Sequence, residues 1–206
     1  MKSLKLSTRL ALITWGSIVT VVAVVVAINY FSSKAELTRL AQQDQEMRIK
    51  TFWSLLEHQG REFRLVGDKL LIGDYVINGN YALPDKLKTL CGGTATVFMR
   101  DVRVSTNVMK EDGARAVGTK LKGAAYETTF RQGRPFRGEV DILGVKYFAA
   151  YDPIRDGRGQ VIGVLYTGIK RSEFFASFEK SMLRMLIYSL ILATVIAGLV
   201  MALLRR

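Results

Sequence analysis

The first two strands that we predict lie in residues 94–119, TATVFMRDVRVSTNVMKEDGARAVGT. Valines alternate with polar residues over 102–105, and residues 97–100 show the same period of two, which indicates β-strands. Asp101 is the only good turn former between these two runs. Residues 110–113, Lys-Glu-Asp-Gly, predict a polar loop whose tightest point is the Asp-Gly pair. The segment therefore predicts two short strands, joined by a tight turn and followed by a loop.

Four polar side chains of this segment are candidates for binding a small anion: Arg103, Thr106, Asn107 and Arg115. Arg103 is the strongest candidate, because a planar guanidinium can hold a carboxylate through two hydrogen bonds. Other roles stay open for each residue. Arg103 could face solvent on its strand, Asn107 could shape the turn, and Arg115 could pin the loop to the domain.

Three further strands follow in the second half of the sequence. Period-two alternation predicts them at residues 136–142, 145–154 and 161–169. Glycine-containing turns separate them, and short connections of this kind make neighbouring strands antiparallel. A short helix is expected before them, at residues 126–131. Residues 172–183 are expected to form a linker helix after them.

Three tyrosines on these strands are the remaining site candidates. Tyr147 and Tyr151 are four residues apart, so they lie on one face of their strand. They could wall a pocket and donate hydroxyl groups, or they could be ordinary core residues. The same two interpretations apply to Tyr166. Asp152, beside Pro153, is expected in a turn.

A long helical pattern precedes the strands. Residues 32–71 contain no proline, and their hydrophobic side chains recur with helical spacing in two stripes. The first stripe is Leu37, Leu40 and Met47, and the second is Ile49, Phe52, Trp53, Leu56 and Phe63. Two stripes suggest a contact with another helix near the membrane and a face against the sheet further out. A single amphipathic helix that covers its own sheet explains the pattern equally well.

Between this helix and the first strand, residues 73–93 are interrupted by turn signals. Asn78-Gly79 predicts a tight turn, and residues 84–90 predict a short helix with Pro84 in its first turn. Together the patterns predict an α+β fold, in which a long N-terminal helix packs on a five-stranded antiparallel sheet.

An apolar run lies near each end of the sequence, and each is about as long as the ~20 residues that cross a bilayer. The first run is too long for the core of a cleaved signal peptide. Cations flank the outer ends of both runs, which places both termini in the cytoplasm. The predicted order is a cytoplasmic N-terminus at 1–9, a transmembrane helix at 10–31, an extracytoplasmic domain at 32–183, a second transmembrane helix at 184–204 and a cytoplasmic end at 205–206.

Composition excludes several classes of function. The chain has 30 Lys+Arg against 18 Asp+Glu, and a basic central domain suits anionic ligands. Cys91 is the only cysteine and His58 the only histidine, so neither an internal disulfide nor a zinc site built from these ligands is expected. No nucleophile motif or carboxylate pair stands out, so we expect neither an enzyme nor a cofactor. Nucleic acid is not expected as a partner of an extracytoplasmic domain.

Several motifs resemble one family of sensors. They are residues 92–98 (GGTATVF), 103–108 (RVSTNV), 112–113 (DG), 115–119 (RAVGT), Gly144, Tyr147, 151–154 (YDPI) and 159–166 (GQVIGVLY), with Gly73 and Asn78-Gly79 upstream. Over residues 30–180 the sequence resembles the Cache group, specifically the Cache 3/Cache 2 fusion domains of bacterial methyl-accepting chemotaxis receptors. The resemblance implies a PAS-like sheet, a small extracytoplasmic ligand and a signal passed through the second membrane helix.

The sequence is similar, more distantly, to the sensor domains of citrate and dicarboxylate kinases. In those domains an arginine and a polar residue on the strand before the loop hold a carboxylate, and here Arg103 and Thr106 occupy that stretch. Thr106 stands where the kinases have a histidine, and Ala149 falls near their later arginine. The resemblance therefore implies a carboxylate ligand, and a monocarboxylate fits more easily than a dicarboxylate.

The expected protein is a multi-pass protein of the inner membrane with a periplasmic or extracellular sensor domain. The sequence has no HAMP or methylation segment after the second apolar run, so either a separate cytoplasmic transmitter is its partner or the sequence is a fragment. A two-span regulatory or anchor subunit without its own ligand is the alternative function.

A homodimer is the expected assembly. Small residues recur at four-residue spacing in both apolar runs, and such positions let membrane helices approach closely. They are Gly16 and Thr20, Ala23 and Ala27, and Ser189, Ala193 and Ala197. Leu37, Leu40 and Met47 would extend the seam above the bilayer.

Overall fold

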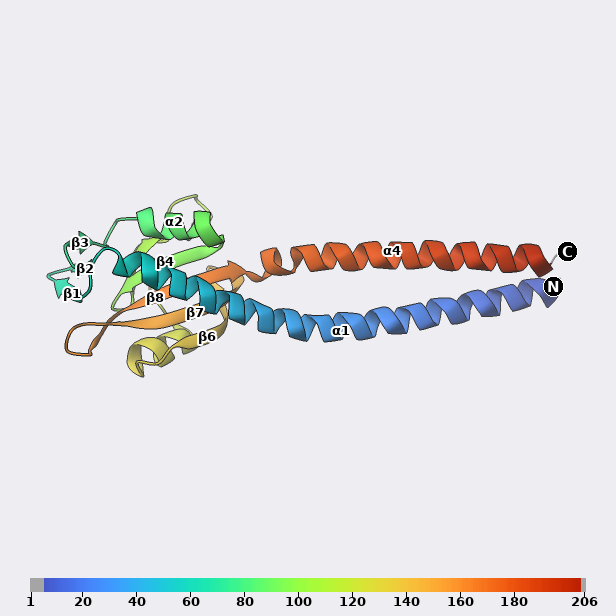
Figure 1. Ribbon diagram of the computed structural model, residues 1–206, viewed down its shortest axis with the longest axis horizontal. Helices are drawn as coiled ribbons and strands as arrows, with labels where there is room; N and C mark the ends of the chain where they lie inside the picture. Colours follow the sequence, from blue (N-terminus) through green and yellow to red (C-terminus); the bar gives the residue numbers. More distant parts are fainter. Residues whose placement is uncertain (1–5, 205–206) are drawn as a thin grey trace. The chain divides into compact units, whose positions relative to one another are not determined.

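The computed structural model describes residues 6–204 and divides into two compact units (Figure 1). Unit 1 comprises Met1–Thr38 and Phe175–Arg206, and unit 2 comprises Arg39–Phe174. The predicted cytoplasmic ends, with Lys2, Lys5, Arg205 and Arg206, lie outside the described residues.

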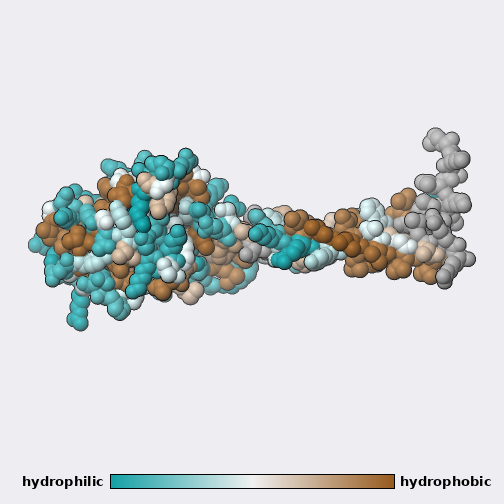
Figure 2. Space-filling view, turned by 90° about the horizontal axis from the view of Figure 1, so that it is seen from above, coloured by the Kyte–Doolittle hydropathy of each residue, from teal (hydrophilic) through white to brown (hydrophobic). Residues whose placement is uncertain are grey.

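Unit 1 contains parts of two long helices, α1 (Leu6–Glu57) and α4 (Arg171–Leu204). Both helices are long and apolar enough to cross a membrane, as the sequence predicts. Hydrophobic side chains cover much of their surface (Figure 2). Several polar side chains in the apolar runs are satisfied within their own helix: Thr20 Oγ1 donates to the Gly16 carbonyl at 2.8 Å and Ser189 Oγ to the Met185 carbonyl at 2.7 Å. Such bonds remove the need for water around these groups.

Unit 2 is built on a five-stranded antiparallel sheet, which confirms the predicted fold class. Its strands follow the order β5-β4-β8-β7-β6. They are β4 (Thr94–Met99), β5 (Val102–Thr106), β6 (Phe136–Ile142), β7 (Val145–Arg155) and β8 (Val161–Lys170). The last strand, β8, therefore lies in the centre of the sheet, between β4 and β7, and β5 and β6 form the two edges.

β7 continues through Asp152 and Pro153, so the predicted turn at Asp152 was wrong. The pairing between β6 and β7 starts with Phe136 opposite Tyr151, so β6 does not extend alongside residues 152–155. Pro153 lacks an N–H group, but on that side of β7 no neighbouring strand requires one. On the other side Pro153 still pairs with Val164 of β8.

One face of the sheet packs against α1 and α2 (Ala82–Cys91). Ile49, Phe52 and Leu56 of α1 are fully buried in this core, and the C-terminal part of α1 crosses strands β8 and β7 (Figure 1). The second predicted stripe thus faces the sheet. Leu40 and Met47 of the first stripe are 42% and 64% exposed, so they lie outside this core.

The predicted helix over residues 32–71 was wrong beyond Glu57. Residues 63–76 instead form a small antiparallel sheet of β1 (Phe63–Val66), β2 (Lys69–Ile72) and β3 (Tyr75–Val76). Glycines end the helical pattern. A Cβ on Gly60 would lie 2.6 Å from the Gly73 nitrogen, and Gly67 takes a positive φ of 60° in the turn between β1 and β2.

The opposite face of the sheet is covered by residues 107–131. This segment ends in α3 (Gly123–Ala125) and a short π-helix, η1 (Tyr126–Arg131), where the sequence predicted a helix. Leu121 and Ala125 are buried here with Phe98 and Val164 of the sheet. The two faces of the sheet therefore carry separate cores, and the candidate site belongs to the second.

Candidate ligand-binding site

A row of side chains crosses the sheet on the face covered by residues 107–131. Thr96 of β4 pairs with Thr106 on one side and with Tyr166 on the other, and Tyr166 pairs with Tyr151. Directly opposed residues of antiparallel strands share a face. The register therefore brings three of the predicted site residues, Thr106, Tyr151 and Tyr166, into one row. Tyr147 lies on the same face of β7.

Arg103 lies on this face beside the row, opposite Phe98 of β4. Only 5% of the residue is exposed. Its Cζ lies 5.2 Å from the centre of the Phe98 ring, and its Nη1 donates to Thr119 Oγ1 at 2.8 Å. The buried Nε has no hydrogen-bond partner. One part of the guanidinium is thus fixed, whereas its Nε remains available to an acceptor.

A pocket of about 470 Å³ lies at Arg103, within the usual size range of small-molecule sites. Apolar side chains form most of its wall. Its lining residues are Phe98, Arg103, Thr119, Lys120, Leu121, Lys122, Ala125, Val140, Asp141, Ile142, Leu143 and Tyr151. Of the seven predicted site residues, Arg103 and Tyr151 are therefore the two that line it.

The tyrosines differ in what they offer to a ligand. Tyr166 is fully buried, and its hydroxyl lies 3.0 Å from Thr94 Oγ1, so it already has a hydrogen-bond partner within the domain. The Tyr151 ring lies 4.8 Å from the Tyr166 ring, centre to centre, with the two planes tilted by 42°, and Tyr151 lines the pocket. Burial raises the pKa of both phenols, so both stay protonated at neutral pH. Of the three predicted tyrosines, Tyr151 is therefore the one that lines the pocket, and its phenol is protonated.

The charge around Arg103 is unbalanced. Among residues 6–204, none of the ion pairs involves Arg103. Burial lowers the pKa of its guanidinium, because removing the cation from water disfavours the charged form. Of the two lysines in the lining, Lys120 pairs with Asp101 at 3.7 Å, and Asp141 is the one carboxylate of the lining. A buried cation without a counterion is stabilised by a bound anion.

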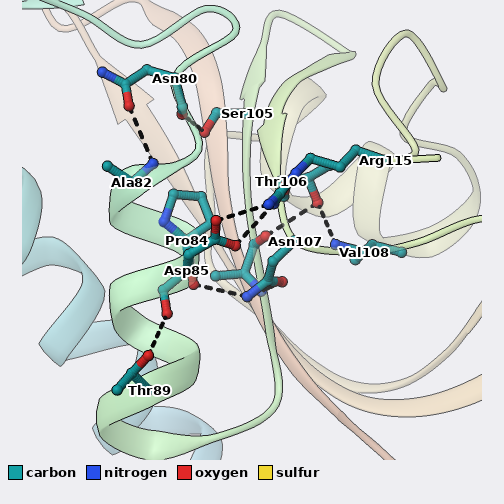
Figure 3. Close-up of polar contacts among 11 residues, drawn as sticks. Asn80, Ala82, Pro84, Asp85, Thr89, Ser105, Thr106, Asn107, Val108 and Arg115 are labelled. Carbon is teal, nitrogen blue, oxygen red and sulfur yellow. Dashed lines mark hydrogen bonds and ion pairs between the residues drawn. The ribbon is translucent and has the colours of Figure 1, made fainter. Parts of the chain in front are cut away.

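Thr106, Asn107 and Arg115 are engaged by the protein itself (Figure 3). Thr106 Oγ1 lies 2.6 Å from Thr96 Oγ1 and accepts the Val108 N–H at 3.0 Å. The Asn107 amide accepts from the Ala95 N–H and donates to the Pro84 carbonyl. These bonds tie β4, β5 and α2 together, and the pocket lining includes neither residue.

Arg115 makes a two-pronged ion pair with Asp85 of α2, with both N–O distances between 2.8 and 2.9 Å (Figure 3). Its Nη1 also donates to the Thr106 carbonyl at 2.8 Å, and its Cζ lies 4.5 Å from the centre of the Tyr81 ring. Arg115 therefore pins the loop to the domain, one of the two roles that the sequence left open.

The pocket residues Thr119, Lys120 and Lys122 were not predicted. They join the site because the chain after the loop returns along the outer edge of β5. The Arg103 N–H donates to the Thr119 carbonyl, and Val102 forms an antiparallel bridge with Lys120. No local pattern predicts this return, and Gly118 is the only strong turn former near it.

The chain matches a family model and solved structures. The family model described as "Single cache domain 3" matches residues 75–181. Among solved structures, the crystal structure of the E. coli DcuS sensor domain is similar with a TM-score of 0.39 and 16% sequence identity, and the match covers 48% of this chain and 71% of that chain. No curated protein sequence matches the chain significantly.

The Arg115–Asp85 pair is predicted to stabilise the fold. Replacing either partner, by Arg115→Ala or Asp85→Asn, should lower the free energy of unfolding, and the double variant should lose less than the sum. Because both side chains are partly exposed, we expect a coupling of about 1 kcal/mol. Chemical denaturation of the full chain in detergent measures it. Additive losses would show that the two side chains do not stabilise each other.

Proposed function

The chain belongs to the single Cache domain 3 family, and on that premise we propose that it is a membrane-anchored sensor of a small carboxylate. The carboxylate would bind on the extracytoplasmic side. Binding would send a signal through α4 to a cytoplasmic transmitter, as part of chemotaxis or a related signalling pathway.

The observation that carries this proposal is the buried Arg103 without a counterion. A carboxylate at this position would accept from the unpartnered Nε and neutralise the cation within a mostly apolar pocket. Tyr151 lines the same pocket, and its hydroxyl would be a second donor to the carboxylate. Arg103 is the one buried cation of the lining, whereas Lys120 and Lys122 are exposed. This arrangement favours a ligand with one carboxylate and a compact apolar body.

A sensing role, without catalysis, fits the composition of the pocket. Its lining residues include no histidine or cysteine that could act as a base or nucleophile. His58 lies just beyond the end of α1, where its Nδ1 is 2.7 Å from the Ser54 carbonyl. Cys91 packs against the core on the other face of the sheet.

Covalent connectivity supports an output through α4. Tyr166, which touches the pocket residue Tyr151, lies on β8. β8 ends at Lys170 and α4 begins at Arg171, with no loop between them. A displacement of β8 on binding would therefore be passed directly into the helix that carries the second apolar run.

Arg103→Ala is predicted to abolish ligand-induced stabilisation. Acetate, propionate, lactate, pyruvate and succinate are screened by thermal shift on the full chain in detergent. A ligand present at about 100 times its Kd stabilises the native state by about 2.7 kcal/mol. The variant should lose this shift and keep its fold, because an unpaired buried charge does not stabilise the native state.

Arg64→Ala is the matched control. Arg64 is an exposed arginine on β1, paired with Asp74 at 3.1 Å and absent from the pocket lining. It should retain the full shift. If Arg103→Ala also retained the shift, Arg103 would not be the anchor of the carboxylate.

Both termini are predicted to lie in the cytoplasm, with unit 2 on the other side of the membrane. The motivation is the pair of apolar helices together with the cations at their outer ends. Alkaline phosphatase, which is active only outside the cytoplasm, should be inactive when fused after Arg206 and active when inserted after Arg158, in an exposed turn. Activity of the fusion after Arg206 would contradict this topology.

A parallel homodimer is predicted to form along the first stripe of α1. Leu40 and Met47 are exposed and lie seven residues apart, which places them on one side of the helix. In a Cys91→Ser background, single cysteines at Leu37 or Leu40 should form disulfides between subunits in oxidised membranes. Gln42→Cys, on another side of the helix, is the control. Equal cross-linking at all three positions, or none at Leu37 and Leu40, would rule out this seam.

A further inference from the structure

β7 connects the pocket to α1 through two adjacent residues. Tyr151 lines the pocket on one face of the sheet. The next residue, Asp152, points to the opposite face because side chains alternate along a strand. There its Oδ2 accepts the Trp53 Nε1–H of α1 at 2.8 Å. A shift of β7 at Tyr151 would therefore also move Asp152, which is hydrogen-bonded to α1.

Arg137 of β6 completes this connection. Its Nη1 lies 2.8 Å from Asp152 Oδ1, and its Nε lies 2.7 Å from Glu46 Oε2 on α1. Nη1 also donates to the Tyr151 carbonyl at 2.9 Å. One guanidinium thus contacts the backbone of the pocket wall, the carboxylate behind that wall and the helix that covers it.

The electrostatics support a defined arrangement. The side chain of Asp152 is 15% exposed and that of Arg137 is 26% exposed, so water screens this pair only partly. The hydrogen bond from Arg137 lowers the pKa of Glu46, so Glu46 is ionised at neutral pH. A guanidinium held between two carboxylates has a fixed orientation, which a lysine could not reproduce.

The same interface contains three buried polar atoms without hydrogen-bond partners. One is Asp152 Oδ1, whose contact with Arg137 is an ion pair only. Arg137, Ala150 and Thr167 form a row across the sheet on the face of α1. Thr167 Oγ1 in this row is buried and unpartnered, and so is Oε1 of Gln45, the α1 residue next to Glu46. Unpaired buried groups disfavour an arrangement relative to one that pairs them. A second arrangement of α1 on the sheet that pairs these atoms would therefore recover part of this cost.

We propose that Arg137 is a positioning residue that holds Tyr151 at the pocket and, with Asp152, couples pocket occupancy to α1. This inference rests on the proposed carboxylate site and goes beyond it, because it makes α1 an output element in addition to α4. Binding at Tyr151 and displacement of α1 then affect each other equally, as linkage requires.

Hydrogen exchange of the full chain in detergent tests the coupling, with acetate, propionate, lactate, pyruvate and succinate as probes. A probe that binds should slow exchange in the pocket segment 119–125 and in the α1 segment 39–57. In Asp152→Asn the slowing in 119–125 should remain and the slowing in 39–57 should be lost. Arg137→Lys should also weaken binding by about 5-fold or more, at the low end of allosteric couplings.

The matched control is Asp74→Asn, which removes an exposed ion pair with Arg64 on the small sheet. It should leave both responses unchanged. A purely structural role of Asp152 would alter exchange without a probe but would not remove the probe-induced slowing in α1. Persistence of that slowing in Asp152→Asn, or its absence from the wild type when a probe protects 119–125, would overturn the proposal.

A second measurement needs no ligand. Glu46→Gln changes an α1 residue that forms an ion pair with Arg137 of β6, and it should speed exchange in residues 147–152 of the probe-free protein. Unchanged exchange there would overturn the coupling. If none of the five probes protected 119–125, the carboxylate site itself would fail, and this ligand-free measurement would still decide whether α1 and the pocket wall are coupled.

Discussion

Alternation along the strands of the five-stranded sheet is the constraint on which the rest of unit 2 depends. Adjacent residues of a strand point to opposite faces, so each strand serves two cores at once. Tyr151 faces the pocket while Asp152 faces α1, and Tyr166 lies on the same face as Tyr151 while Thr167 lies on the face of α1. The pocket and α1 therefore lie on opposite faces of a single sheet, with no other element between them.

Two arginines close together in the sequence show how the environment assigns a role. Arg115 meets Asp85 and the Tyr81 ring, so its charge is neutralised and its side chain pins a loop. Arg103 is buried beside Phe98 and has one hydroxyl partner, so its charge stays uncompensated. Arg115 is neutralised within the protein and stabilises the structure, whereas the unpaired charge of Arg103 would be stabilised by an external anion.

The helices that carry the apolar runs differ from unit 2 in which side chains they expose and in how their polar side chains are hydrogen-bonded. In unit 1, apolar side chains cover the surface, and hydroxyls such as those of Thr20 and Thr194 bond to carbonyls four residues earlier. In unit 2, buried polar side chains such as Thr106 and Asn107 bond to other strands and helices. α1 contributes to both units, so one helix contains a stretch suited to lipid and a stretch suited to a sheet.

The sequence by itself determined the features that depend on neighbouring residues. Period-two alternation located the five strands, and continuous hydrophobicity located both apolar helices. The guanidinium chemistry of Arg103 made it the strongest candidate for binding an anion. Only the tertiary structure decided that residues 63–76 form a small sheet and that Thr106 and Asn107 bond to β4 and α2. It also decided that residues 119–122 return to the pocket. These outcomes depend on strand register and on contacts between distant segments, which no local period specifies.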